Sequence, residues 1–574
     1  MSGTCLFSNR RIAALQNYEN VRKWCKDDSL LGFVVGDANT KTIVNILFNF
    51  VTDLSAACDV ARFIESSFSA EVSLLGILSL MDVEYAFDVR KLGTMTSNAA
   101  RFVPLSTSTT TLLNRDSELF IDENSEVLSI REAKDNATVR RAGILVRVCH
   151  KISFNIRVEN PDRISEELAK MFAREMEVVD TLCFLNAEKN VMLSNGSQPD
   201  ISSSLFEGLQ KPQFDKDRAE FVPLIAVSSE LNEGVGTRLV PIVKIKNGPV
   251  TYYSMKTFIT GYTVIRANDS SDTVLELLRE ALRRALFLFE KCTAFSNFIA
   301  QDFIEVESFI FFYRESVICV YYPRSNNEAL LRGCRSKLHR VFNLSFERPL
   351  LRPSQAVLFN SNSTLLRDPH LHILHYKPKG KLSLVKGHYD YHHYMQDGID
   401  DTGWGCAYRS LQTIWSWLVL QGYTNKAVPS HREIQESLYE CGDKDAKFVG
   451  SRQWIGSMEL GYCLDNMLGI QSRIINTNSG AEVADNVRQL ALHFNSSGTP
   501  VMIGGGMLAH TIIGVDFNDS TGECAFLVLD PHYTGEENMS IVVSKGWCGW
   551  KAPSFWKQEH FYNLLLPQPP LNVI

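Results

Sequence analysis

The stretch D-D-T-G-W-G-C-A-Y-R-S, residues 400–410, places a cysteine at the start of an expected helix. After Cys406, apolar residues recur at 411, 414, 415 and 418 with helical spacing, and the pattern stops at Gly422. The partial positive charge and free amides of a helix N-terminus favour a thiolate. Gly403 and Gly405 would let the backbone approach closely and aim amides at an oxyanion. Cys406 is therefore a candidate nucleophile, although a cysteine in such a place is more often a small buried hydrophobe.

A second motif follows an apolar run. Residues 524–530, C-A-F-L-V-L-D, are typical of a buried strand that leads into Asp530-Pro531-His532. Residues two apart in an extended chain project to the same side, so Asp530 can accept a hydrogen bond from His532 and fix its tautomer. The simpler alternative is a turn in which Asp530 caps its own backbone. Together with Cys406, the motif has the constellation of a papain-like cysteine hydrolase in which aspartate precedes histidine.

Composition restricts the class of protein. The chain has 574 residues, 45% of them hydrophobic, and a formal net charge of −7, which favours a multidomain globular protein. No basic run that could follow a phosphate backbone is present, so nucleic acid is not an expected partner. The 13 cysteines include no C-x-x-C pair, which argues against a disulfide framework or a thiolate zinc site and favours a reducing, cytoplasmic setting. We find no signal-peptide pattern and no stretch apolar and long enough to span a bilayer directly.

Four regions are expected along the chain. Residues 1–190 mix short β-like runs with helical stretches, which predicts an α+β domain. Residues 191–365 form the second part of the N-terminal region, in which Thr273 to Glu276 reads as a capping box opening a long amphipathic helix. Residues 366–387, with little periodicity, are expected to be a linker. Residues 388–574 carry the motifs and are expected to form an α/β, papain-like cysteine protease domain.

Four motifs carry a family resemblance. H-Y-D-Y-H-H-Y-M-Q-D (388–397), D-D-T-G-W-G-C-A-Y-R-S-L-Q-T (400–413), A-H-T-I-I-G-V-D (509–516) and L-V-L-D-P-H-Y-T-G (527–535) occur in one order. In these motifs the chain resembles the proteases specific for ubiquitin-fold modifier 1, cysteine proteases of peptidase family C78. The long N-terminal extension is similar to that of the type 2 members. The resemblance covers the C-terminal third closely and the remainder loosely.

The resemblance implies a role for each residue of the site. Cys406 would be the nucleophile, His532 the general base and acid, and Asp530 the orienting carboxylate. Tyr394, twelve positions before Cys406, would complete the oxyanion hole, since a phenol donates a hydrogen bond without changing its charge. The implied reaction is acyl transfer from a C-terminal glycine, both in maturing the modifier precursor and in releasing the modifier from lysine conjugates. The resemblance implies no cofactor. It does imply association with the endoplasmic reticulum through a membrane-anchored adaptor.

Other residues are weaker candidates. Trp404, Gly504, Gly505, Gly506 and His510 are expected to line a narrow substrate channel. The glycine run could equally be a tight turn, and a histidine within an apolar strand is more often a buried structural residue.

A metal site is not expected. In a metal-dependent isopeptidase, a His-x-His pair is followed by a serine and an aspartate at fixed spacing. The pair His370-x-His372 is not followed by these residues, and a glycine stands at position 380. The pattern of runs within residues 1–190 nevertheless resembles that metalloprotease (MPN) fold in a form without ligands, which would make this region a binding domain.

Two alternatives stay open. The autophagins also pair G-W-G-C with D-P-H and cleave after glycine in a different ubiquitin-like modifier, but the residues around Cys406, A-Y-R-S-L-Q-T and M-Q-D, depart from that family. An adaptor with vestigial catalytic residues is the second alternative. The intact set of Cys406, Asp530, His532 and Tyr394 argues against it.

Overall fold

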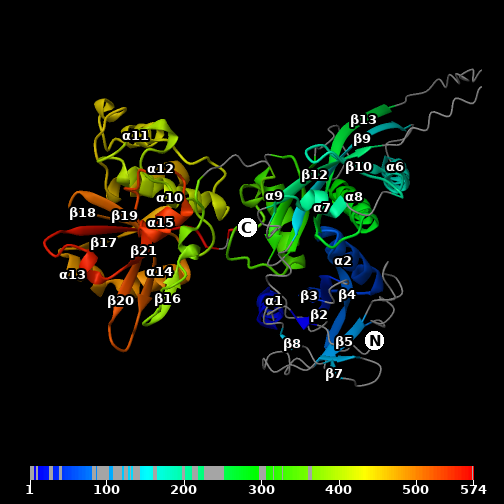
Figure 1. Cartoon of the computed structure of the whole chain (residues 1–574), viewed down its shortest axis with the longest axis horizontal. Helices are drawn as coiled ribbons and strands as arrows, with labels where there is room; N and C mark the ends of the chain where they lie inside the picture. Colours follow the sequence, from blue (N-terminus) through cyan, green and yellow to red (C-terminus); the bar gives the residue numbers. More distant parts are fainter. Residues whose placement is uncertain are drawn as a thin grey trace, which may run out of the picture. The chain divides into compact units, whose positions relative to one another are not determined.

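The chain divides into two compact units, Met1–Ser345 and Phe346–Ile574. The computed structural model (Figure 1) describes residues 6–7, 11–24, 30–37, 42–80, 86, 103–107, 119–121, 127–128, 131–132, 143–158, 164–196, 201–209, 217–224, 251–295, 306–313, 316–325, 327–359, 365–571 and 573–574. Both units combine helices with sheets, which confirms the expected mixed class. Within the described part of the chain, no helix is both long and apolar enough to cross a membrane.

The first unit contains an eight-stranded sheet, a five-stranded sheet and a hairpin. The first sheet has the order β7-β6-β5-β4-β2-β3-β1-β8 and the second the order β11-β10-β12-β9-β13. The strands are β1 (Leu6–Phe7), β2 (Leu30–Asp37), β3 (Thr42–Phe50), β4 (Ser73–Leu80), β5 (Val103–Thr107), β6 (Leu119–Ile121), β7 (Val127–Leu128), β8 (Arg131–Glu132), β9 (Ile144–Val158), β10 (Cys183–Asn186), β11 (Val191–Leu193), β12 (Arg218–Leu224), β13 (Thr251–Ile265), β14 (Val306–Tyr313) and β15 (Ser316–Pro323). The helices are α1 (Arg11–Trp24), α2 (Leu54–Ser67), α6 (Ile164–Val179), α7 (Ile201–Phe206), α8 (Ser271–Phe295) and α9 (Glu328–Val341).

The long amphipathic helix is α8, which packs on β13 and β15 and against α2 and α6. Its apolar face is buried at Val274, Leu278, Leu282 and Phe289, as the sequence pattern predicts. The helix begins at Ser271 rather than at the expected capping box, because the hydroxyl of Ser270 accepts a hydrogen bond from the backbone N–H of Thr273.

The expected division at residues 190/191 falls inside the five-stranded sheet. β10 pairs with β11 across it, and β12 pairs with β9. These ladder hydrogen bonds and the shared core place residues on both sides of the division in one unit.

The second unit is built on a seven-stranded sheet in which all neighbouring strands are antiparallel. The order is β17-β22-β18-β19-β20-β21, and β16 also pairs with β19. The strands are β16 (Lys381–Leu384), β17 (Gln471–Thr477), β18 (Val501–Gly505), β19 (Leu508–Phe517), β20 (Cys524–Leu529), β21 (Cys548–Lys551) and β22 (Tyr562–Gln568). The helices are α10 (Cys406–Leu420), α11 (His431–Glu440), α12 (Ser457–Leu468), α13 (Gly480–Asp485), α14 (Val487–Ser496) and α15 (Met539–Ser544), with short 3-10 turns η4 (Pro353–Gln355), η5 (Pro369–His372), η6 (Gln396–Gly398), η7 (Ala446–Phe448) and η8 (Pro553–Phe555).

Helices cover both faces of this sheet, because alternate strand residues are apolar on both sides. On β18, Met502 belongs to the core beneath α10 and α12, whereas its neighbour Ile503 belongs to the core beneath α13 and α14. Leu565 and Leu564 of β22 divide in the same way. The cysteine helix thus lies on one face of a fully buried sheet centre, as the expected papain-like α/β domain requires (Figure 1).

Residues 366–387, the expected linker, lie within the second unit. β16 pairs antiparallel with β19, from Lys381 opposite Phe517 to Leu384 opposite Gly514. Asp516 holds the entry to β16 by accepting hydrogen bonds from the hydroxyl of Tyr376 and the backbone N–H groups of Lys379 and Gly380. The partner strand comes more than a hundred residues later in the chain, so this pairing leaves no pattern in the local sequence.

Candidate active site

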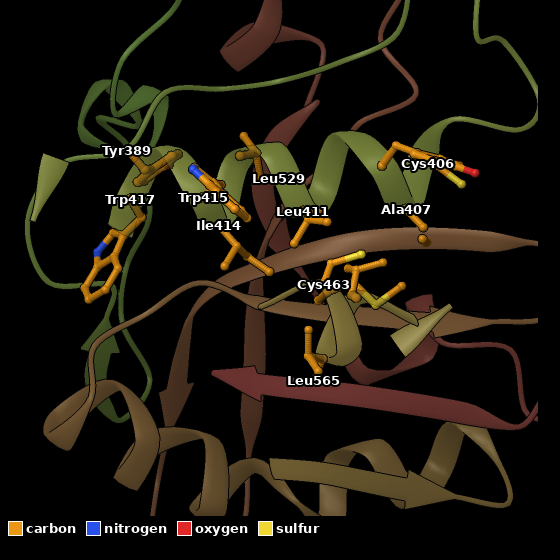
Figure 2. Packing of buried hydrophobic residues seen from close by; sticks show 14 of the residues in the cluster. Tyr389, Cys406, Ala407, Leu411, Ile414, Trp415, Trp417, Cys463, Leu529 and Leu565 are labelled. Carbon is orange, nitrogen blue, oxygen red and sulfur yellow. The ribbon is translucent and has the colours of Figure 1, made fainter. Parts of the chain in front are cut away.

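Cys406 is the first residue of α10, so its backbone N–H is one of the amides that a helix leaves without an internal partner. The helix is buried for most of its length and packs on β18 and β19. Figure 2 shows Ala407, Leu411 and Ile414 pointing from α10 toward the strands, with Cys406 at the end of the helix. The Cys406 residue is 8% exposed, so its sulfur sits at the edge of the core.

The G-W-G sequence before Cys406 is required by the shape of the turn. Gly403 has φ +82°, in the left-handed region that disfavours side chains. A Cβ on Gly405 would lie 2.4 Å from Oδ2 of Asp401. The backbone N–H groups of Trp404 and Gly405 both donate to the Asp401 carbonyl, at 3.1 and 2.8 Å. This tight turn delivers the chain to the start of α10.

Asp530 and His532 follow the end of β20, where the backbone N–H of Asp530 donates to the Trp547 carbonyl at 2.7 Å. His532 Nδ1 lies 2.6 Å from Asp530 Oδ1, and the His532 backbone N–H donates to the same oxygen at 3.0 Å. The Asp530 carboxylate therefore both orients the His532 ring and caps its own backbone turn, the two roles that the motif predicts. The carboxylate accepts from Nδ1, which leaves Nε2 as the nitrogen that faces the cysteine.

Cys406 and His532 each change the pKa of the other. Burial acts to raise the pKa of Cys406, but the hydrogen bond and charge of His532, with the Ala509 N–H and the Tyr394 hydroxyl, bring that pKa below its ordinary value. Burial acts to lower the pKa of His532, yet Asp530 and Cys406 outweigh it and raise the pKa to about 9. Nε2 of His532 makes no other hydrogen bond among the described residues, so this nitrogen is left for the Cys406 sulfur. The lowered pKa of Cys406 and the raised pKa of His532 together favour a thiolate–imidazolium pair.

Other cysteines differ from Cys406 in this respect. Burial is the main cause that raises the pKa of eight of them: Cys58, Cys149, Cys292, Cys319, Cys334, Cys463, Cys524 and Cys548. Cys463 and Cys548 share the hydrophobic core with Cys406, so burial alone does not explain its acidity. The imidazolium partner is what distinguishes Cys406.

Tyr394 reaches the site from the loop before α10. Its ring is perpendicular to that of His532, with centroids 5.3 Å apart, and its hydroxyl is near enough to the Cys406 sulfur to help lower the pKa of that thiol. Its backbone N–H donates to the Pro531 carbonyl at 2.9 Å, which ties it to the Asp530–His532 turn. Burial and the neighbouring thiolate raise the pKa of Tyr394, so the phenol keeps its proton. The structure therefore brings the four expected catalytic residues together.

His510 lies on β19 behind Asp530. Its Nε2 is 3.8 Å from Asp530 Oδ2, and its ring centroid is 5.2 Å from that of His532. Burial lowers the pKa of His510 to about 4, so the ring is neutral. The three side chains offer possible metal-ligand atoms within 4.8 Å of one another, but Asp530 and His532 already bond to each other. The arrangement fits a histidine that supports the carboxylate better than a metal centre.

A cavity of about 450 Å³ opens beside His532. Gly505 and His510, two of the expected channel residues, line it together with Met507, Leu508, Asp530, Phe555, Trp556, Lys557, His560 and Tyr562. Gly504 and Gly505 are the last two residues of β18, and Gly506 occupies the turn with φ +62°, so the glycine run is also the tight turn considered as its alternative. Trp404 packs instead against the rings of Tyr408 and His431.

Sequence reasoning missed a buried polar group beneath the site. Asp401 and Arg409 are both 0% exposed and joined at 2.8 Å, and His431 Nε2 lies 3.0 Å from the same carboxylate oxygen. The helical pattern gave no signal for it, because Arg409 lies on the side of the expected helix opposite the apolar stripe at 411, 414, 415 and 418.

Two family models match the chain. Residues 380–565 match peptidase family C78, and residues 220–364 match the model described as ubiquitin-fold modifier 1 specific protease 2, N-terminal. These matches lie in the second unit and mainly in the first unit, respectively.

Known proteins resemble the chain over most of its length. A Caenorhabditis elegans Ufm1-specific protease is 39% identical over 98% of this chain and 94% of its own. The human Ufm1-specific protease 2 is 44% identical over 58% of this chain and 71% of its own. The crystal structure of UfSP from C. elegans superposes with a TM-score of 0.78 at 34% identity, covering 100% of both chains. With its thiolate–imidazolium pair at the start of α10, the chain belongs to the Ufm1-specific protease family, whose C-terminal unit is a peptidase of family C78.

Proposed function

We propose that the chain is a thiol-dependent protease that matures the precursor of ubiquitin-fold modifier 1 at its C-terminal glycine and releases the modifier from lysine conjugates. The observation that carries the proposal is the Cys406–His532–Asp530 arrangement, with its acidic thiol, in a chain of this family. An alkyl thiol is mostly protonated at neutral pH, whereas the ion pair supplies the nucleophile continuously.

In the first half of the reaction, the Cys406 sulfur attacks the carbonyl carbon of the glycine. The C–S bond forms as the carbonyl π pair moves to oxygen, and the Tyr394 hydroxyl and the free Cys406 N–H donate to that oxyanion. His532 then gives its Nε2 proton to the leaving amine, the C–N bond breaks, and a thioester remains. Asp530 holds the ring so that Nε2 points toward the sulfur.

In the second half, water replaces the amine. Neutral His532 takes a proton from water at Nε2, and the oxygen attacks the thioester carbonyl. The second tetrahedral intermediate collapses with loss of the Cys406 thiolate, which restores the ion pair and frees the modifier as a C-terminal carboxylic acid that loses its proton to the solvent. Both precursors and lysine conjugates fit this scheme, because only the leaving amine differs between them.

An activity-probe experiment tests the proposal on the full chain. Ubiquitin-fold modifier 1 with a C-terminal electrophile should label wild type at Cys406 and should not label Cys406→Ala. An autophagy-modifier probe of the same chemistry serves as the control. Labelling by the control probe alone would refute the substrate assignment, and labelling by neither would refute the protease assignment.

We further propose that residues 1–190, within the first unit, are a non-catalytic, MPN-like binding region and that the first unit recruits conjugates through an adaptor anchored in the membrane of the endoplasmic reticulum. The family resemblance and the separate compact fold of this unit support the proposal. Photo-cross-linkers placed on the exposed sheet residues Val222 and Phe258 of the full chain would capture such an adaptor in cells. Cross-links that never include a membrane protein would contradict it.

A further inference from the structure

Asp401 is a completely buried residue at which five N–H groups converge, three on its carboxylate and two on its backbone carbonyl. Its Oδ1 accepts from the backbone N–H of Met395 at 2.9 Å, and its Oδ2 accepts from Arg409 Nε at 2.8 Å and faces His431 Nε2 at 3.0 Å. Its carbonyl accepts the two N–H groups of the turn before α10. One residue therefore joins the segment after Tyr394 to the segment before Cys406.

Arg409 extends this connection. It lies on α10 one turn after Cys406 and is 0% exposed. Beyond Asp401, its guanidinium donates to Asp397 Oδ2 and to the Gln396 carbonyl, each at 2.8 Å. Arg409 therefore fixes η6, the turn that begins two residues after Tyr394, directly to the nucleophile helix.

The loop between Tyr394 and Asp401 needs such support. Met395 and Asp397 have φ values of +65° and +60°, in the left-handed region that residues other than glycine rarely adopt. Each such residue costs about 1–3 kcal/mol and persists only where surrounding contacts enforce it. Contacts to Asp401 and Arg409 enforce it here, beside the hydrogen bonds of the Gln396 side chain.

We propose that Asp401 is a positioning residue that, through Met395 and Arg409, holds the Tyr394 hydroxyl at the oxyanion position beside Cys406. The inference rests on the proposed function and adds to it the device that sets the oxyanion hole. Tyr394 has a second tether, its N–H bond to the Pro531 carbonyl. The two tethers fix the phenol relative to the nucleophile helix and to the histidine turn, respectively.

A carboxylate suits this position better than its amide. Burial acts to raise the pKa of Asp401, but the hydrogen bonds from His431 and Arg409 and the arginine charge lower it below its usual value. The side chain is thus an anion with acceptor sites on both oxygens. In Asp401→Asn, one oxygen becomes an NH₂ group that must face an N–H donor of Met395, Arg409 or His431.

A double-mutant cycle tests the inference by comparing wild type, Tyr394→Phe, Asp401→Asn and the double variant. The measurement is kcat for hydrolysis of a fluorogenic amide at the C-terminus of ubiquitin-fold modifier 1. We expect Tyr394→Phe to lower kcat about 10²-fold, as loss of one oxyanion donor does. Asp401→Asn should lower it to a similar degree, and the double variant by little more than either single change.

Alkylation of Cys406 by iodoacetamide separates positioning from general damage. It requires the thiolate and no oxyanion hole. Because His532 lowers the pKa of Cys406 more than the Tyr394 hydroxyl does, Asp401→Asn should retain the wild-type rate within about twofold. Asp516→Asn is the matched control, since Asp516 is equally buried and accepts three hydrogen bonds from Tyr376, Lys379 and Gly380. It should lower the melting temperature but leave kcat unchanged.

The outcomes divide clearly. Independent effects that multiply to about 10⁴-fold, or lost alkylation in Asp401→Asn, would overturn the inference while leaving the proposed function standing. Should Asp401→Asn fail to fold, Arg409→Lys replaces it in the cycle, because lysine keeps the charge but cannot span Asp401, Asp397 and the Gln396 carbonyl. An inactive wild type would refute the proposed function first and the inference with it.

Discussion

The charge of Asp530 should control the alkaline side of the pH profile. In wild type, kcat/KM should rise as Cys406 loses its proton, at a pH below the ordinary range of a thiol. It should fall again as the pH passes about 9, where His532 loses the proton that makes the ion pair. Because the two groups are coupled, both limbs report the pair rather than either residue alone.

Asp530→Asn keeps the size of the side chain and removes its charge. The Asp530 carboxylate is the main group that raises the pKa of His532 against the effect of burial, so removing its charge should lower that pKa. If the pKa falls from about 9 to about 7, the protonated fraction of His532 at pH 8 falls from about 90% to about 9%. We therefore expect kcat/KM to fall by about twofold at pH 7, about tenfold at pH 8 and about 50-fold at pH 9.

The assay is kcat/KM of the full chain for the fluorogenic modifier amide between about pH 5.5 and 9.5 at constant ionic strength. The rate of Cys406 alkylation over the same range gives an independent titration of the thiolate. Asp516→Asn should follow the wild-type profile, since its carboxylate bonds only to the segment leading into β16. An equal loss at every pH, with the alkaline limb still near 9, would refute the reasoning.

Three further changes probe the nucleophile and its support. Cys406→Ala should abolish hydrolysis and leave the melting temperature almost unchanged; measurable turnover would exclude the thiol as nucleophile. Gly405→Ala should lower unfolding free energy by about 1–3 kcal/mol and also lower kcat, because its Cβ would lie 2.4 Å from Asp401 Oδ2. Gly333→Ala, with no atom within 4 Å of the added carbon, is the control for urea melts, and an equal effect of both would contradict the packing argument. Leu411→Ala should destabilise the second unit by about 2–5 kcal/mol, and a loss under 1 kcal/mol in the same melts would mean that the α10 core relaxes around it.

The nucleophile and the base could be predicted from the sequence because each depends on residues close to it in the chain. The helix start at Cys406 follows from glycine, cysteine and helical spacing within a few residues. Asp530 and His532 follow from a strand that ends where its two polar residues share a side. Tyr394 could be assigned only by resemblance, since its place depends on left-handed residues after it that no propensity favours.

Long-range pairing explains what the sequence did not reveal. β16 pairs with the distant β19, and β12 lies between β10 and β9, so a window along the chain shows a linker and a domain break where sheets are continuous. The sequence did not predict the helix start at Ser271, because Ser270 and Thr273, three residues apart, can both serve as the N-cap residue.

Because of the ion pair at Cys406, a chemical reaction with the thiol can also distinguish folded from unfolded protein. Its partner His532 lies on a turn that the sheet brings to α10, so an unfolded chain holds an ordinary thiol at position 406. Where burial raises the pKa of the other cysteines, those thiols are nearly unreactive at mildly acidic pH. A single alkylation measured there counts correctly folded molecules in a mixture, without substrate, antibody or fluorescent tag.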